Sequence, residues 1–417
     1  MENSATGGTI VLDNCTLIDA QHPEPRPGMQ IVIESGLIKE VTSEPVKSAG
    51  ARRIDVGGRS VLPGLIDCHN HICLSEVSTR RLDAVPLTLM TARAVPVLKA
   101  TLDRGFTTLR DAGGADWGIR TAIEDGLIPG PRLFIAGQAL SQTGGHGDFR
   151  HRTEKALTCP CESAMRFTKY IADGVPEVQR ATRELLRQGA DQIKVMVSGG
   201  VASLNDPIDA TQYSADELRA IVAEAGAWKT YVMAHAYTPE AITHAIRSGV
   251  RTIEHANLVD AAAARLIHDN DAFAVPTLVT YDRLAAHGKD YGFPEVSMRK
   301  LARVLEAGLQ AMDILKQAGV KIGFGTDLLG DLRRYQSREF VIRAEVLTPY
   351  EIICQATRVN AEILNRTNQL GVIAAGATAD LIVVDGDPLR DISLLDGQGE
   401  HIPLVMKDGV VHKQWLQ

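Results

Sequence analysis

The sequence predicts an α/β fold: a (β/α)8 TIM-like barrel with a small β-sandwich domain formed by both termini. Apolar segments of strand length alternate with amphipathic helical segments through the middle of the chain. Both ends instead contain short strand patterns separated by Gly, Pro and Ser. A chain of 417 residues is long enough for one large barrel and a smaller appended unit. Repeated alternation of strand and helix is typical of parallel sheets and of barrels.

The β-sandwich is expected from residues 1–60 and 366–417, and the barrel from residues 61–365. An open doubly wound sheet is the alternative, but no Gly-rich fingerprint follows the first central strand. The barrel strands are predicted at residues 61–67, 106–110, 132–136, 191–197, 231–235, 251–254, 273–277 and 321–326.

Helix starts between these strands carry recognisable caps. Ser214 and Glu217 have the spacing of a capping box before a helix that extends to about Trp228. Thr348 and Glu351 repeat that spacing. Pro239 follows Thr238 at the first helical position, where its missing N–H costs no hydrogen bond.

Composition narrows the function classes. The net charge is −7, and no basic cluster is present that would follow a phosphate backbone, so a nucleic-acid partner is not expected. No apolar run approaches the ~20 residues of a bilayer span, and no signal peptide is recognisable, so we expect a cytoplasmic protein without a membrane partner. The six cysteines do not resemble a disulfide framework. Cys159 and Cys161 could bind a soft metal, but loop thiols or a bridge within the loop fit better.

The segment 141–172 is long and irregular, and it follows the third predicted barrel strand. Loops of this length are usually lids or binding loops. In a barrel it would lie over the face where active sites form.

Metal-ligating residue types occur at the ends of predicted strands. His69 and His71 are two residues apart, so their side chains would leave a strand on the same side. The other candidates also fall within or directly after strands; they are Lys194, His235, His255 and Asp327. Imidazole and carboxylate groups suit zinc and related divalent ions.

Each of these residues alone has an ordinary structural explanation, such as a hydrogen-bonded core histidine or a helix cap. Their joint occurrence at strand ends favours a metal site. Lys194 is the unusual member, because an ammonium cannot bind a metal. It would have to be neutral or carry CO2 as a carbamate, whose two oxygens can bridge two ions.

Several motifs resemble the amidohydrolase superfamily. They are the segment from Leu62 to His71, the strand lysine, the later histidines, the Gly-Thr-Asp ending at Asp327 and the segment from Gly371 to Asp380. Within that superfamily, residues 142–148, 194–201 and 234–237 resemble the binuclear carboxypeptidase and prolidase branch. That branch includes prolidases, Xaa-Arg and Xaa-Lys carboxypeptidases, and amidases that hydrolyse ochratoxin A.

The resemblance implies two divalent metal ions, with Zn²⁺ as the expected metal. It implies that His69, His71 and Asp327 hold the first ion. His235 and His255 would hold the second, and carboxylated Lys194 would bridge the two.

The resemblance also implies catalytic roles. Asp327 would take a proton from the attacking water and return it to the leaving amine. His146 would donate to the carbonyl oxygen or bind the substrate carboxylate, and Tyr237 is a second candidate for carboxylate binding.

The expected partner is a small amide or dipeptide whose C-terminal amino acid is released, and ochratoxin A, which yields phenylalanine, is the preferred case. Xaa-Arg or Xaa-Lys carboxypeptidase and prolidase activities are the alternatives. Hydrolysis of a cyclic amide and deamination are less favoured, because deaminases of the superfamily usually lack the bridging lysine. A catalytically silent barrel is disfavoured by the intact ligand set. The resemblance further implies a homo-oligomer, such as an octamer.

Overall fold

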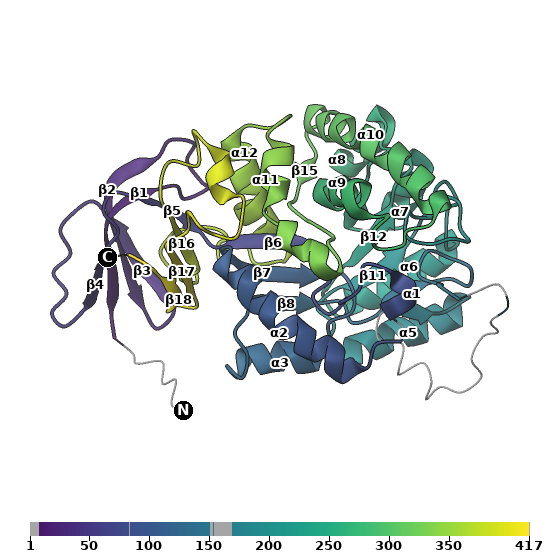
Figure 1. Ribbon diagram of the computed structural model, residues 1–417, viewed down its shortest axis with the longest axis horizontal. Helices are drawn as coiled ribbons and strands as arrows, with labels where there is room; N and C mark the ends of the chain where they lie inside the picture. Colours follow the sequence, from purple (N-terminus) through teal and green to yellow (C-terminus); the bar gives the residue numbers. More distant parts are fainter. Residues whose placement is uncertain (1–7, 83, 151–152, 154–168, 417) are drawn as a thin grey trace.

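The computed structural model describes residues 8–82, 84–150, 153 and 169–416. A β-rich part contains strands from both chain ends, and a larger α/β part contains the middle of the chain (Figure 1). The described helices all lack the combination of length and apolar composition that a bilayer span needs.

Strands from the two chain ends pair in one mixed sheet of eight strands. They are β1 (Ile10–Leu17), β2 (Arg26–Glu34), β3 (Leu37–Thr42), β4 (Arg52–Asp55), β5 (Ser60–Pro63), β16 (Leu381–Val384), β17 (Leu404–Lys407) and β18 (Val410–Gln414). The order is β18-β17-β16-β5-β1-β2-β3, with β4 paired to β1. Pairing of β5 with β16 joins the two chain ends, as expected. A sandwich of two sheets stays a prediction.

The α/β part contains two sheets whose strand pairs are all parallel. The first consists of β6 (Leu65–Asn70), β7 (Phe106–Asp111) and β8 (Arg132–Ile135). The second has the order β10 (Lys169–Ile171), β9 (Ala139–Ser141), β11 (Ile193–Met196), β12 (Val232–Ala236), β13 (Thr252–His255), β14 (Phe273–Val275) and β15 (Lys321–Ile322). The prediction of an α/β fold with parallel sheets is confirmed.

The strand predicted at residues 61–67 is in fact two strands in different sheets. The chain leaves β5 and enters β6 at Gly64. A Cβ atom at Gly64 would lie 2.2 Å from Thr107 Oγ1, so only glycine fits this close crossing. The domain boundaries at 60/61 and 365/366 stay predictions.

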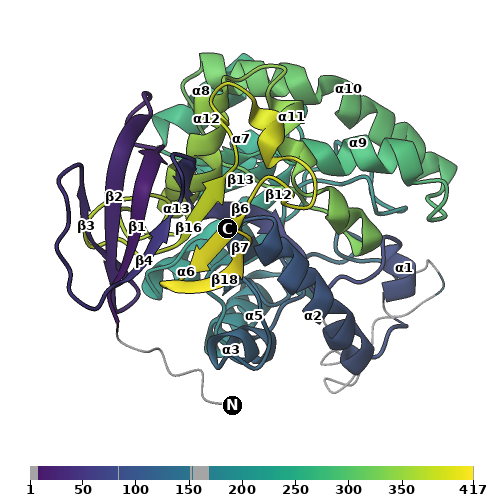
Figure 2. The same cartoon turned by 60° about the vertical axis from the view of Figure 1, so that its left-hand side comes forward.

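Helices lie on opposite sides of the central strands (Figure 2). They are α1 (Thr79–Leu82), α2 (Leu87–Asp103), α3 (Trp117–Glu124), α5 (Val175–Arg187), α6 (Ala215–Ala227), α7 (Pro239–Arg247), α8 (Ala261–Asp269), α9 (Leu278–His287), α10 (Glu295–Gln317), α11 (Arg338–Arg343), α12 (Pro349–Cys354) and α13 (Asn360–Ile363). Shorter turns are the 3-10 helices η1 (Gly330–Tyr335) and η3 (Ile392–Leu395) and the π-helix η2 (Gln355–Val359). Both predicted capping boxes are present, at the starts of α6 and α12.

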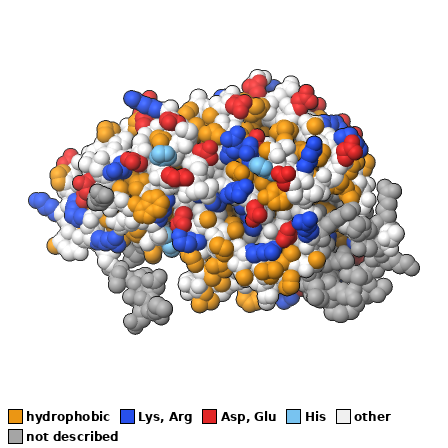
Figure 3. Space-filling model, viewed as in Figure 1, with side chains coloured by type: hydrophobic (Ala, Val, Ile, Leu, Met, Phe, Trp, Pro, Cys, Tyr) orange, Lys and Arg blue, Asp and Glu red, His pale blue; other side chains and the backbone are white. Residues whose placement is uncertain are grey.

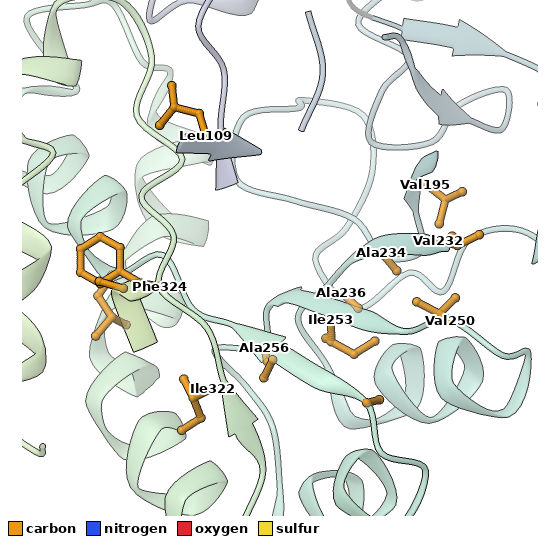
Figure 4. Packing of buried hydrophobic residues seen from close by; sticks show 14 of the residues in the cluster. Leu109, Val195, Val232, Ala234, Ala236, Val250, Ile253, Ala256, Ile322 and Phe324 are labelled. Atoms are coloured by element: carbon orange, nitrogen blue, oxygen red, sulfur yellow. The ribbon is translucent and has the colours of Figure 1, made fainter. Parts of the chain in front are cut away.

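Every residue of β12 and β13 is buried, as expected for parallel strands that are covered on both faces. Side chains such as Val195, Ala234 and Ile253 pack in the core between strands and helices (Figure 4). Backbone hydrogen bonds join the first sheet to segments beside strands of the second, from Cys68 N to Phe324 O, just after β15, at 2.8 Å and from Asp191 N, just before β11, to Ile135 O at 2.7 Å. A fully closed eight-stranded barrel stays a prediction.

Candidate active site

His69 and His71 lie at the end of β6, and each ring has one nitrogen held by a neighbour. His69 Nδ1 donates to Glu254 Oε2 at 2.6 Å, and His71 Nδ1 donates to the Gly113 carbonyl at 2.7 Å. Both Nε2 atoms therefore face the same side, 3.6 Å and 3.1 Å from Asp327 Oδ1. Fixing one nitrogen in this way is how proteins orient a metal-binding imidazole.

Asp327 reaches this position because the segment after β15 lies against β6. The Asp327 backbone N–H donates to the His69 carbonyl at 2.8 Å. A Cβ atom at Gly325 would lie 2.7 Å from His69 Cβ, so glycine permits this approach. Asp327 has a φ of 53°, a left-handed conformation that its short polar side chain tolerates.

His235 and His255 end the neighbouring strands β12 and β13. Their ring centroids are 4.7 Å apart, and His255 is 4.8 Å from His69. His235 Nε2 donates to the Gly199 carbonyl at 3.1 Å, and His255 Nδ1 contacts Thr277 Oγ1 at 2.8 Å. Each ring again keeps one nitrogen available. His255 has a φ of 74°, and strain of this kind at a bulky residue is typical of functional sites.

Burial sets the protonation of this cluster. Burial is the largest cause that lowers the pKa of His69, His235 and His255 well below the usual value. Burial would also lower the pKa of His71, but its hydrogen bond to Asp327 raises it. Burial would raise the pKa of Asp327, but the nearby imidazoles of His69 and His71 lower it. Neutral imidazoles and an ionised carboxylate are the forms that bind divalent metals.

Lys194, on β11, has no hydrogen-bond or ion-pair partner among the described residues, although it is only 1 % exposed. It lines the same cavity as the four histidines. Burial lowers the pKa of its amine to about 8, so much of it is neutral near that pH. A buried amine without a partner is costly as an ammonium. The position of Lys194 fits a metal-binding carbamate, because a carbamate forms from the neutral amine.

The structure brings all six predicted ligands to one cavity. Atoms of His69, His255 and Asp327 come within 4.8 Å of one another, which is close enough for a shared ion. Imidazole nitrogens and carboxylate oxygens are the usual ligands of zinc sites, so the residue types and the free ring nitrogens fit divalent metals. The division of these residues between two ions stays a prediction.

Buried ionic residues behind the ligands were not singled out in the sequence. Glu254 is fully buried, holds His69 and is itself bound by Arg110, at 2.9 Å and 3.0 Å from the same guanidinium nitrogen. Thr252 donates to the other Glu254 oxygen at 2.6 Å. The sequence did contain an indication, since Arg110 and Glu254 are opposite charges inside two predicted strands, and charges that are buried are usually paired.

His146 lies over His235, with the two rings stacked 4.4 Å apart. His146 Nδ1 contacts Ser203 Oγ at 2.7 Å and lies 3.5 Å from Asp206 Oδ2. Ser203 and Asp206 were not predicted as part of the site. A Cβ atom at Gly200 would lie 2.1 Å from His146 Cε1, so this glycine makes room for the ring.

Tyr237 also lines the cavity, and its hydroxyl is 2.9 Å from the hydroxyl of Tyr281, a residue that the sequence did not indicate. Together with His146, these hydroxyls are polar groups beside the ligand cluster. The cavity holds about 630 Å³, including its mouth. Much of its wall is apolar and consists of Val77, Val201, Ala202, Leu284, Phe293, Leu329 and Leu332.

The predicted lid, 141–172, is described only in part, and Cys159 and Cys161 lie outside the described residues. Arg150 is described and binds Asp148 at 2.5 Å. The cysteines at 15, 68, 73 and 354 are free and buried.

Comparison with known proteins adds to this geometry. The model of the amidohydrolase family matches residues 60–411. Ochratoxinase from Aspergillus niger is 32% identical over 411 residues, covering 94% of this chain and 84% of that protein.

Two solved structures are also similar over nearly the whole chain. An amidohydrolase superposes with a TM-score of 0.96 at 53% identity, covering 98% of this chain and 100% of its own. A prolidase complexed with N-methylphosphonate-L-proline has a TM-score of 0.95 at 50% identity, covering 97% and 100%. Since the family match extends across most of the sequence and includes the strand-end histidines, lysine and aspartate described above, this chain belongs to the amidohydrolase family and is a hydrolase.

Proposed function

We propose that this protein hydrolyses the amide bond of a dipeptide or an N-acyl amino acid and releases the C-terminal amino acid. The observation that carries the proposal is Lys194, buried without a described partner in a cavity that five imidazoles and Asp327 also line. A lysine in that place is useful as a metal bridge and costly as a free cation.

We propose two divalent ions, with zinc as the expected metal. His69, His71 and Asp327 would hold one ion, and His235 and His255 the other. Carboxylated Lys194 would bridge them: its neutral amine attacks CO2, a C–N bond forms, a proton leaves, and a carbamate anion with two oxygens results. Bound divalent ions supply Lewis acidity, which polarises a carbonyl and lowers the pKa of water to about 7.

The residues of the chain would position and protonate the substrate. Asp327 would accept the proton of the attacking water and then donate it to the leaving amine. Its ionised form and its place between His69 and His71 support that role. His146 would donate a hydrogen bond to the substrate, because its Nδ1 is held by Ser203 and Asp206 and its ring lies over His235.

We propose that Tyr237, with Tyr281 and His146, binds the substrate carboxylate. The two tyrosine hydroxyls meet at 2.9 Å, so one donates to the other and the second keeps its proton for a carboxylate. Holding that group near the metals would orient the scissile amide, and orientation is a large part of catalysis.

The leaving amino acid is proposed to be apolar. Asp327 is the only carboxylate among the described residues that line the cavity, so an arginine or lysine side chain would find no free counter-charge. Two relatives indicate candidates for the leaving amino acid. The prolidase bound to a proline analogue favours proline, and ochratoxinase supports phenylalanine, which ochratoxin A would release, as the second candidate.

The test is kcat/KM for zinc-loaded enzyme on matched N-acyl compounds that end in proline, phenylalanine or arginine, and on their methyl esters. We expect an apolar residue to exceed arginine by at least about tenfold, which is about 1.4 kcal/mol of transition-state binding. We expect the esters to be poor substrates. Preference for arginine would replace the apolar assignment with Xaa-Arg carboxypeptidase activity, and equal rates on acids and esters would remove the carboxylate site.

The homo-oligomer, such as an octamer, and the cytoplasmic location stay predictions. Sedimentation of the metal-loaded protein checks the first.

A further inference from the structure

Two of the buried arginines in the described chain have an ion-pair partner, and two have none. Arg110 binds Glu254 at 2.9 Å, and Arg343 binds Glu339 at 2.7 Å. The other two buried arginines, which form no ion pair with a described carboxylate, are Arg104 and Arg333. A buried charge without a counter-charge is costly, so these two need a physical explanation.

The contacts of Arg104 are all with neutral groups. Its nitrogens donate to Gln336 Oε1 at 2.9 Å, to Thr101 Oγ1 at 3.1 Å and to Gln398 Oε1 at 3.1 Å. Burial, with a smaller contribution from the positive charge of Arg333, lowers the pKa of Arg104 to about 10, although the more distant carboxylates of Asp103 and Asp67 raise it. The guanidinium is therefore held in place but not neutralised.

Arg333 is held by backbone carbonyls. Its Nε donates to Gly330 O at 3.0 Å, and its Nη1 donates to the carbonyls of His71 and Ile72. Its remaining nitrogen, Nη2, has no hydrogen-bond partner among the described residues. Arg333 is 5 % exposed, so this free donor belongs to a side chain that is otherwise enclosed.

Arg104 and Arg333 line the same cavity, between α2 and η1, which is separate from the active site and holds about 1130 Å³ including its open side. Arg93 and Arg334 also line it. The described lining thus contains four arginines against two carboxylates, and Glu76, one of these, is already paired with Arg93 at 2.7 Å. Figure 3 shows Lys and Arg side chains in the middle of the molecular face that Figure 1 presents.

We propose that this cavity binds a phosphate-like oxyanion. Planar guanidinium groups recognise such anions through paired, charge-assisted hydrogen bonds. The anion would accept from Arg333 Nη2 and supply the counter-charge that the two buried arginines lack. The site does not depend on the proposed amidase function.

The test is isothermal titration of the metal-loaded protein with inorganic phosphate, and separately with glycerol 3-phosphate, at constant ionic strength. The variants are Arg104→Gln, which removes a buried charge, and Arg334→Ala, which removes an exposed one and leaves the buried framework intact. Arg219→Ala, an exposed arginine on α6, is the matched control. Circular dichroism and gel filtration of each variant accompany the titrations.

We expect phosphate affinity to fall at least about tenfold in Arg104→Gln, equivalent to about 1.4 kcal/mol, and less in Arg334→Ala, with no change in Arg219→Ala. Tighter binding of glycerol 3-phosphate would identify a phosphate ester as the ligand, and equal or weaker binding would identify free phosphate. If Arg104→Gln does not fold, the phosphate affinity of Arg334→Ala tests the proposal, and a decrease relative to the wild type supports it.

Equal affinity in the wild type and both cavity variants would place the phosphate at the metal centre and overturn the proposal. So would the absence of saturable binding. A change in oligomeric state with unchanged phosphate affinity would show that a second copy of the chain covers the cavity, and it would also overturn the proposal.

Discussion

At the scale of single residues, the environment of each side chain determines its chemistry. Lys194 and Asp327 are both ordinary residues whose pKa values are lowered in this site, the first by burial and the second by the neighbouring imidazoles. The amine is brought close to neutrality, and the carboxyl is kept ionised. These are the states that a metal-bridging carbamate and a general base require.

Replacing Lys194 by alanine tests the bridge. We expect metal content to fall from about two ions per chain, and turnover to fall with it, because the second ion loses a ligand. A short carboxylic acid should restore part of the activity by supplying the missing oxygens. Elemental analysis and kinetics measure both effects, and Lys316→Ala, exposed on α10, is the control. Full metal content in Lys194→Ala would contradict the bridge.

Asp327→Asn tests the proton transfer. The amide keeps the shape of the side chain but is a poor base, so kcat should fall by about 10²–10⁴-fold. Asp313→Asn on α10 should leave kcat unchanged. Metal content must be measured in parallel, and normal turnover in an Asp327→Asn variant that keeps its ions would remove this residue from the mechanism. The acidic limb of the pH–rate profile belongs to Asp327 and the metal centre together, since their titrations are coupled.

At the scale of elements, strand ends supply the proposed metal ligands, and the loops after them supply much of the cavity wall. The loop after β11 contains Gly199, whose carbonyl holds His235, and Gly200, which makes room for His146. Lys300, on α10, fixes this loop by donating to the carbonyls of Gly200 and Ser203 at 3.0 Å and 2.9 Å. A helix outside the active site therefore determines where His146 lies.

Gly200→Ala tests this arrangement. The added Cβ would lie 2.1 Å from the His146 ring, so the ring or the loop must move. We expect kcat/KM to fall at least about tenfold, about 1.4 kcal/mol, while metal content is retained. Gly226→Ala in α6 is the matched control, because its Cβ would meet nothing within 4 Å, and it should stabilise the fold by about 0.4–1 kcal/mol. Unchanged kcat/KM in Gly200→Ala would show that the position of His146 does not matter for catalysis.

At the scale of the whole molecule, burial of the histidine cluster links stability to pH. His69, His235 and His255 have lowered pKa values in the folded chain, so the unfolded chain binds more protons below about pH 6.5. Stability is therefore lost as pH falls. His71, with a raised pKa, acts in the opposite direction, but it is one residue against three.

We therefore expect the metal-free protein to become less stable between pH 7.5 and 5.5. Each of the three histidines contributes at most about 1.4 kcal/mol per pH unit. Urea unfolding of chelated protein at the two pH values measures this, and the zinc-loaded protein should be more stable than the metal-free form at pH 7.5. Equal stability of the metal-free protein at both pH values would contradict the burial of neutral histidines.

The α/β fold with parallel sheets was predictable from local patterns, and so was the gathering of the candidate ligands in one cavity. Strand patterns alternate with helical ones, and capping boxes mark helix starts. The candidate ligands at the end of a predicted strand, or just after it, are His69, His71, His235, His255 and Asp327. Because the carboxyl ends of neighbouring parallel strands meet at one edge, residues at strand ends are brought together by topology. The break at Gly64 could not be predicted, since it depends on contact with Thr107 from another strand.

The sequence by itself therefore determined the α/β fold with parallel sheets, the candidate ligand types and the hydrolase family, since these depend on local periodicity, residue type and motif. Tertiary structure decided which groups hold the ligands, such as Glu254 on His69, because hydrogen bonds between distant segments leave no pattern in a single sequence. It also decided that Lys194 is left without a described partner and that Arg104 and Arg333 share a cavity. Burial and pairing of charges are properties of three-dimensional packing. They determine which charged groups lack a partner within the described chain and therefore favour binding a ligand or a metal.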